Sequence, residues 1–180
     1  MPQRIHIFGA SGSGTTTLGR ALSAELQIPQ LDTDSYYWKP TDPPFLEKNQ
    51  PSDRILMIER DIAGLDGWIL SGSICSWGDP LLHHFTLAVF LHLAPSVRMA
   101  RISRRERDRH GVRIDPGGDM HTQHMEFLTW AESYDTASAP VRSLDLHQRW
   151  MKRLNCPIVR LDSDRGVDNL TQEVAARAVA

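Results

Sequence analysis

A glycine- and serine-rich segment near the start of the chain, GASGSGTTT at residues 9–17, has the composition and spacing of a loop that binds phosphate. In the pattern G-x-x-x-x-G-K-[ST], Gly9 and Gly14 take the glycine positions and Thr16 takes the hydroxyl position. Glycines let a backbone turn sharply, so that its N–H groups can surround phosphate oxygens. Thr15 stands where the pattern has lysine, so this loop offers backbone donors without the usual cation.

The segments on either side of the loop are those that phosphate binding requires. Residues 4–8 are predicted to form a buried strand, and residues 15–27 a helix with a stripe of leucines, whose N-terminus carries partial positive charge. The Thr16 hydroxyl is suited to hold Mg²⁺. The alternative is a polar turn that only begins a helix. We expect nucleotide phosphates to contact Gly9, Ser11, Gly12, Ser13, Gly14, Thr15, Thr16 and Thr17.

Two carboxylates follow the next predicted strand, residues 28–31. Asp32 and Asp34 are two residues apart, so they point to the same side if the extended backbone continues. Parallel sheets bind ligands beyond the carboxyl ends of their strands, which would place both side chains beside the phosphate loop. The alternative is a turn closed by Asx hydrogen bonds, with Asp34 as a helix cap.

The third group is the arginine-rich segment 98–113, which holds seven arginines. Arg101, Arg105 and Arg109 recur every four residues, so a helix displays them as one stripe. Planar guanidinium groups can bind phosphate through paired hydrogen bonds. The alternative is a solvated helix whose arginines pair with Glu106 and Asp108.

Strands and helices alternate along the chain. Further strands are predicted at 68–70, 86–93 and 157–161, and further helices at 53–65, 95–109 and 121–134. This order predicts an α/β fold in three layers, with a parallel sheet wrapped by helices. Gly9, Asp32, Ser71 and Asp162 then all lie at the carboxyl ends of strands.

The composition predicts one small enzyme domain. The chain has 180 residues, 41% of them hydrophobic, and a formal net charge of -2, which argues against nucleic acid or an anionic membrane as a partner. No apolar run is long enough for a membrane span, and no signal peptide is evident. Cys75 and Cys156 are too few for a disulfide framework or a zinc cage. We expect a cytoplasmic protein.

The phosphate loop, the acidic strand end at 32–34 and the arginine-rich helix at 101–109 carry a family resemblance. The chain resembles P-loop kinases of nucleoside monophosphates and shikimate, and more closely bacterial proteins described as adenylate-kinase-like. The resemblance implies a five-stranded parallel core in a single domain over residues 1–180. It also implies an acceptor-binding insertion at about 33–66 and a mobile lid at about 109–125. ATP and Mg²⁺ would be the cofactors, and a nucleoside triphosphate and a small molecule the partners.

The same resemblance implies roles for individual residues. Asp32 would support Mg²⁺, and Asp34 would orient or deprotonate the acceptor hydroxyl. Arg101 and Arg105 match an R-I-x-x-R helix whose arginines reach the donor phosphates. Arg165, after the fifth strand, would stack on the adenine base.

Two departures from the family pattern bear on function. Ser71-Gly72-Ser73 follows the third strand, where nucleoside monophosphate kinases have Asp-Gly and then a proline and an arginine, so a plain nucleoside monophosphate is not the expected acceptor. The missing lysine removes a donor of the kind that contributes about 2.7–4 kcal/mol, which lid arginines can replace.

The sequence predicts an ATP-dependent kinase of a small-molecule or nucleotide-like acceptor. The alternative is a nucleotide-binding module without phosphoryl transfer, acting as a sensor or interaction protein. A kinase of nucleic-acid ends would need a basic groove. The acceptor, the preferred base and the oligomeric state stay open.

Overall fold

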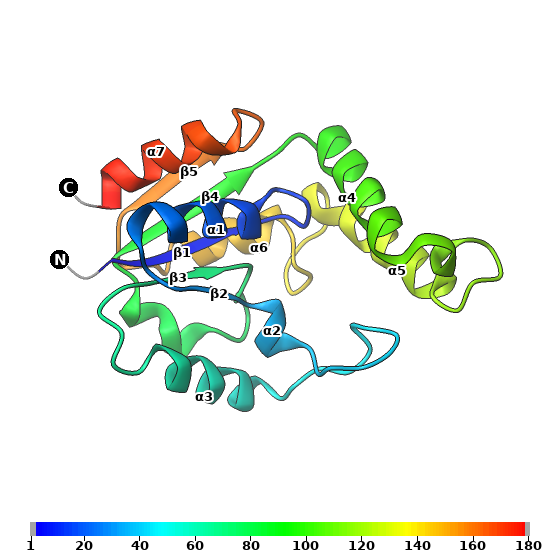
Figure 1. Ribbon diagram of the computed structural model, residues 1–180, viewed down its shortest axis with the longest axis horizontal. Helices are drawn as coiled ribbons and strands as arrows, with labels where there is room; N and C mark the ends of the chain where they lie inside the picture. Colours follow the sequence, from blue (N-terminus) through cyan, green and yellow to red (C-terminus); the bar gives the residue numbers. More distant parts are fainter. Residues whose placement is uncertain (1–2, 179–180) are drawn as a thin grey trace.

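The computed structural model describes residues 3–178 and shows a parallel five-stranded sheet (Figure 1). The strand order is β2-β3-β1-β4-β5. The predicted α/β fold with a parallel five-stranded sheet is confirmed. The strands are β1 (Arg4–Gly9), β2 (Gln30–Asp32), β3 (Trp68–Ser71), β4 (Leu87–His92) and β5 (Ile158–Asp162).

Helices cover both faces of the sheet, with α1 and α7 on one face and α3 and α6 on the other. Helices α4 and α5 extend beyond the carboxyl edge of the strands (Figure 1). No described helix combines the length and apolar character needed to cross a bilayer. The α-helices are α1 (Thr15–Leu26), α2 (Asp34–Tyr37), α3 (Pro51–Ile62), α4 (Pro95–His110), α5 (His121–Glu132), α6 (Leu144–Met151) and α7 (Val167–Ala178), and the short 3₁₀ helices are η1 (Asp79–His84), η2 (Gly111–Ile114) and η3 (Ser133–Asp135).

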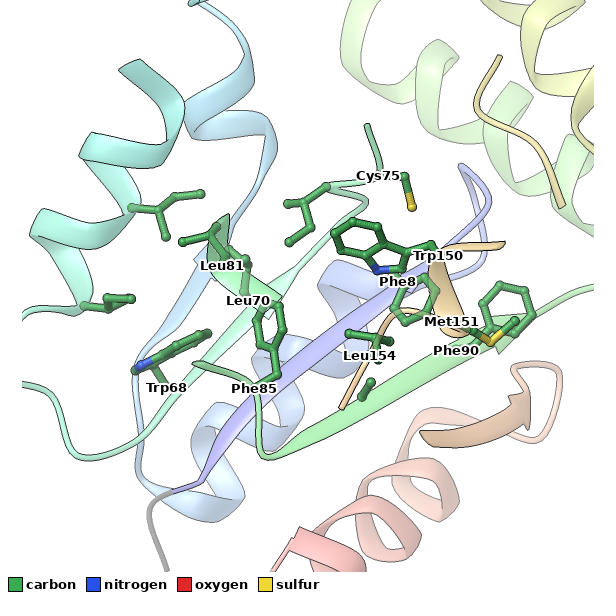
Figure 2. Packing of buried hydrophobic residues seen from close by; sticks show 14 of the residues in the cluster. Phe8, Trp68, Leu70, Cys75, Leu81, Phe85, Phe90, Trp150, Met151 and Leu154 are labelled. Carbon is green, nitrogen blue, oxygen red and sulfur yellow. The ribbon is translucent and has the colours of Figure 1, made fainter. Parts of the chain in front are cut away.

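The central strand β1 shows how the sheet separates two hydrophobic clusters, because successive side chains of a strand point to opposite faces. Ile5 and Ile7 are fully buried against α1 and α7. Phe8 points the other way and packs with Phe90 and Trp150 in the cluster beneath α3 and α6 (Figure 2). Each such burial contributes roughly 1.5–3 kcal/mol, so both faces hold the carboxyl edge of β1 in place.

Several element boundaries differ from the predicted ones. The second strand begins at Gln30 rather than at residue 28. Helix α3 begins at Pro51, because proline fits the first helical turn, where its missing N–H leaves no broken hydrogen bond. Helix α5 ends at Glu132, and the chain tightens into η3. The helices α2, α6 and α7 were not predicted.

Candidate functional site

A cavity of about 1400 Å³ opens at the carboxyl edge of the sheet. Its walls come from the phosphate loop, the acidic end of β2, the insertion between β2 and α3, the loop after β3, and helices α4 and α5. The three groups of residues that the sequence singled out therefore share one space. This is the arrangement expected for a ligand of a parallel sheet.

The loop between β1 and α1 has the backbone that phosphate binding requires. Gly12 and Gly14 have φ angles of 80° and 94°, a region that side chains with a Cβ rarely adopt. A Cβ on Gly9 would lie 2.5 Å from the Leu91 carbonyl oxygen, so glycine is also needed there for space. No side chain caps α1, and its first turn has no acidic residue, so its N–H groups stay available to an anion.

The hydroxyl of Ser13 adds a second observation at this loop. Ser13 is fully buried, and its Oγ has no hydrogen-bond partner among the described residues. A buried polar group without a partner is costly, which favours a ligand oxygen at this position. Thr15 and Thr16 line the same cavity.

The residues predicted to hold Mg²⁺ lie together. The Thr16 hydroxyl donates to Asp32 Oδ2 at 2.8 Å, across the gap between α1 and β2. Within residues 3–178, no group of three or more histidine, cysteine, aspartate or glutamate side chains could hold a metal ion. Mg²⁺ commonly takes one or two protein oxygens and completes its octahedron with phosphate oxygens and water. A hydroxyl and a carboxylate beside a phosphate loop fit that requirement.

Asp34 reaches the cavity by a different path from the expected one. The extended backbone does not continue past Asp32, because the chain turns into α2 at Asp34. The Asp34 backbone N–H donates to Asp32 Oδ1 at 3.0 Å, which is the Asx turn of the alternative interpretation. Both carboxylates nevertheless line the cavity.

The environment of Asp34 raises the pKa of its carboxyl above the usual value. Its pKa is raised, first because the cavity walls withdraw the carboxyl from bulk water and second because Asp32 lies close. The cations that oppose this shift are Arg142, Arg105 and Arg109. A carboxylate with a raised pKa is better suited to accept a proton from a hydroxyl than one held strongly acidic by its neighbours.

The arginine stripe faces the cavity. Arg101, Arg105 and Arg109 all line it from α4, whereas Arg104 has an 87% exposed side chain and lies outside it. The Arg101 guanidinium reaches Asp164 at 3.3 Å and that of Arg105 reaches Glu106 at 3.1 Å. The Arg101 pair is exposed on both sides, so a phosphate can replace its carboxylate at little cost, whereas the Glu106 partner of Arg105 is buried.

Arg98, the first arginine of the segment, lies in the protein interior. The Arg98 side chain is 1% exposed, donates to the Leu93 carbonyl oxygen at 3.1 Å and pairs with Asp135 at 2.6 Å. It therefore joins the start of α4 to η3. The stripe predicted from the four-residue spacing began at Arg101 and did not include it.

Arg165 lies at the edge of the candidate site. Its guanidinium pairs with Glu173 of α7 at 2.8 Å, and the cavity is lined by its neighbours Gly166 and Val167. Its contact with an adenine base stays a prediction.

Sequence reasoning missed two cations in the cavity wall, Arg54 and Arg142. The Arg54 guanidinium lies 3.9 Å from the Tyr37 ring centroid, and that of Arg142 lies 4.4 Å from the Trp130 centroid. The Nε of Arg142 is buried without a partner in the described part of the chain, and burial lowers the pKa of this side chain. A signal was available, since Arg142 is the only lysine or arginine between Arg113 and Arg149.

The aromatic residues near the site divide into buried ones and ones that line the cavity. Tyr36 is buried and donates to Asp61 Oδ2 at 3.0 Å, so it serves packing, whereas Tyr37 and Trp38 line the cavity. Phe127 and Trp130 line the cavity as well, because α5 lies beyond the sheet edge (Figure 1).

The predicted lid and insertion segments touch across the cavity mouth. Arg113 pairs with Asp42 at 2.9 Å, and the Gln123 side-chain amide donates to the Pro44 carbonyl oxygen at 2.8 Å. The site is therefore enclosed by segments that are far apart in the sequence.

Comparisons with known proteins agree with this geometry. Residues 5–124 match the protein family described as AAA domain. The chain is 42% identical over 174 residues to the protein YqaC of Bacillus subtilis (strain 168), with 97% of this chain and 96% of that protein covered.

Two solved structures share the fold at low sequence identity. A shikimate kinase from Bacteroides thetaiotaomicron has a TM-score of 0.59 and 19% identity, with 98% of both chains covered. A gluconokinase from Sinorhizobium meliloti 1021 has a TM-score of 0.56 and 18% identity, with 99% of this chain and 92% of that one covered. At such identity the likeness concerns the fold alone. The family match and the close relative together show that the chain belongs to the AAA domain family, built on the P-loop kinase fold.

Proposed function

We propose that the protein is an ATP-dependent kinase that transfers the γ-phosphoryl group of Mg²⁺-ATP to a small-molecule acceptor. One observation carries the proposal: the loop amides, the Thr16–Asp32 pair and the second carboxylate, Asp34, line a single cavity. The loop amides at residues 9–17 would hold the phosphates, and Thr16 and Asp32 would hold Mg²⁺. The ion would neutralise charge on the transferred group when bound.

Arginines of α4 would supply the positive charge that Thr15 lacks. Arg101 and Arg105 line the cavity that the phosphate loop opens into; Arg101 pairs with the exposed carboxylate of Asp164 and Arg105 with the buried carboxylate of Glu106. Donors aimed at developing charge are the main contribution a protein makes to phosphoryl transfer. In this proposal residues 109–125, which continue from the end of α4, act as the lid that covers the phosphates.

The acceptor would occupy the end of the cavity near Asp34, between the lid and the insertion at 33–66. Asp34 would orient the acceptor hydroxyl or take its proton. Arg54 and Arg142 at this end support an acceptor that itself carries negative charge. The reaction would take place in the cytoplasm, where ATP is available, in a single domain over residues 1–180.

A second candidate is a nucleotide-binding module without transfer. The sequence favours it at two positions, because Thr15 replaces the loop lysine and Ser71 ends the third strand where related kinases carry a carboxylate. Such a module would bind nucleotide but would not transfer its phosphoryl group.

Calorimetry and single-turnover chemistry separate these candidates. The purified chain is titrated with ATP and GTP, with and without Mg²⁺, and then mixed with γ-labelled ATP and hydroxy acids that include shikimate and gluconate. Transfer of the label supports the kinase, tight binding without transfer supports the module, and indifference to every nucleotide refutes both.

A matched pair of glycine variants ties binding to the loop. In Gly12→Ala the new Cβ would lie 2.9 Å from Ile102 Cγ1, at a φ of 80°. Gly64→Ala imposes similar backbone strain at a φ of 78°, with no atom within 4 Å and away from the cavity. Nucleotide binding should be lost in Gly12→Ala and kept in Gly64→Ala.

A further inference from the structure

Three side chains form a hydrogen-bonded chain directly behind the cavity wall. The Tyr134 hydroxyl lies 2.7 Å from His147 Nδ1, and His147 Nε2 lies 3.0 Å from Ser73 Oγ. They come from η3, from α6 and from the loop after β3. Ser73 lines the cavity, while Tyr134 and His147 are buried behind it. The phosphate-loop chemistry uses none of the three.

The direction of the two hydrogen bonds follows from burial. His147 is fully buried, and burial, followed by the nearby charge of Arg142, lowers its pKa to about 3, so the ring is neutral and has one donor and one acceptor nitrogen. Among residues 3–178, the Tyr134 hydroxyl makes no hydrogen bond except that to His147. Its proton must therefore point to Nδ1, since the opposite direction would leave a buried O–H without an acceptor. His147 Nε2–H then donates to Ser73 Oγ.

This direction leaves the proton of Ser73 free to point elsewhere. The imidazole cannot accept it, which is the reverse of the Ser–His arrangement that activates a nucleophile. The Cys75 thiol lies beside Ser73, but burial raises its pKa to about 12, so it stays protonated and is a weak acceptor. An anionic oxygen in the cavity is the stronger acceptor. Arg142 lines the same end of the cavity, so a negative charge is favoured there.

We propose that Ser73 determines specificity by donating its O–H to an anionic oxygen of the bound acceptor, and that Tyr134 and His147 are positioning residues that fix this direction. The identity of the ligand as an acceptor rests on the proposed kinase function. The direction of the hydrogen bonds and the binding of an anion do not depend on the kinase function. The ligand class is a hydroxylated carboxylic acid or phosphate ester, rather than an uncharged polyol.

The direction is tested by ¹⁵N spectroscopy of the histidine-labelled full chain. We expect His147 to carry its proton on Nε2 and to remain neutral between pH 8 and pH 5. In Tyr134→Phe the Nδ1 atom loses its donor, and the two tautomers should mix. A ring protonated on Nδ1, or a charged ring at pH 6, overturns the proposal without any variant having to fold.

Anion recognition is tested by calorimetry with gluconate, shikimate and, as an uncharged probe, sorbitol. We expect at least one acid to bind more tightly than sorbitol, and Ser73→Ala to weaken that binding about tenfold or more, the scale of one hydrogen bond to a charged group. Affinity for Mg²⁺-ATP should change less than twofold. Ser103→Ala, on the exposed side of α4, is the matched control and should bind like the wild type.

The outcomes separate this proposal from the kinase proposal. Binding of neither acid, or equal affinity in Ser73→Ala and wild type, overturns the role of Ser73. Ser73-dependent acid binding without label transfer from ATP leaves that role standing and refutes the kinase. Transfer that does not depend on Ser73 refutes only the specificity role.

Discussion

Removal of single arginines from α4 tests whether they replace the missing lysine. If Arg101 and Arg105 stabilise charge on the transferred phosphoryl group, each alanine variant removes one donor from the transition state. A donor of this kind is worth about 2.7–4 kcal/mol, which corresponds to a fall in turnover of roughly 100- to 1000-fold. Nucleotide affinity should fall far less, because these contacts strengthen only as charge develops.

The expected loss of folding stability is much smaller. Arg101 pairs with Asp164 through side chains that are 43% and 62% exposed, whereas Arg105, 37% exposed, pairs with Glu106, whose side chain is only 11% exposed. The exposed Arg101 pair contributes about 0.2–1 kcal/mol, or a few degrees of melting temperature in a domain of this size. Arg105→Ala should cost more than Arg101→Ala, because it leaves the buried Glu106 carboxylate without this partner. A large loss of turnover with a small loss of stability would therefore identify a role in catalysis.

The measurement is single-turnover transfer of labelled γ-phosphate, with thermal unfolding recorded on the same samples. Arg104→Ala is the matched control, because this side chain is on the same helix, is 87% exposed and pairs with Asp108 at 3.9 Å outside the cavity. Turnover in Arg101→Ala and Arg105→Ala equal to that of Arg104→Ala would refute the reasoning. Thr15→Lys should restore part of the lost rate if the lysine and the arginines serve the same purpose.

Three further predictions concern the metal, the acceptor and pH. Asp32→Asn should keep nucleotide binding without Mg²⁺ and lose most of the Mg²⁺-dependent gain in affinity, which titration at graded Mg²⁺ checks; an unchanged Mg²⁺ dependence would contradict the assigned pair. Arg142→Met keeps an apolar stem over Trp130 and loses the charge, so the acceptor KM should rise roughly tenfold or more while the ATP KM holds; a proportional change in both would point to general damage. Burial lowers the pKa of His6 to about 4 and that of His147 to about 3, so below pH 6.5 the unfolded chain takes up protons that the folded chain does not, and stability should fall by roughly 1 kcal/mol per pH unit for each histidine. Urea midpoints between pH 7.5 and pH 5 should fall less steeply in His147→Asn than in the wild type, and equal slopes would disprove this origin.

The local sequence pattern was sufficient to predict the strand and the helix that hold the phosphate loop. The alternation in β1 and the leucine stripe of α1 depend on neighbours within one or two turns, so the strand, the glycine turn and the helix could be predicted in order. The same holds for the arginine stripe of α4, because residues four apart share a helical face whatever the rest of the fold does.

Strand ends were predicted less well than strands. Asp32 was expected to continue in extended form, yet the chain turns at once into α2, since an Asx hydrogen bond to the Asp34 N–H competes with further strand pairing. The helix α6 escaped prediction although Ser143 caps it through a hydrogen bond to the Leu146 N–H, 3.2 Å long. A helix of this length depends on packing against the sheet for its stability, and that packing is not visible in its own residues.

The sequence alone determined the class of sheet, the phosphate loop and the candidate carboxylates and arginines, because each depends on residues close together in the chain. The tertiary structure alone decided the strand order, the placement of Arg98 in the interior rather than in the cavity, and the meeting of Ser73 with His147 across 74 positions. Contacts of that separation are set by which helices share a face of the sheet. No spacing rule within a single element encodes them, so Ser73 became a candidate only through the packing of α6 against β1 and β4, which brings His147 to the loop after β3.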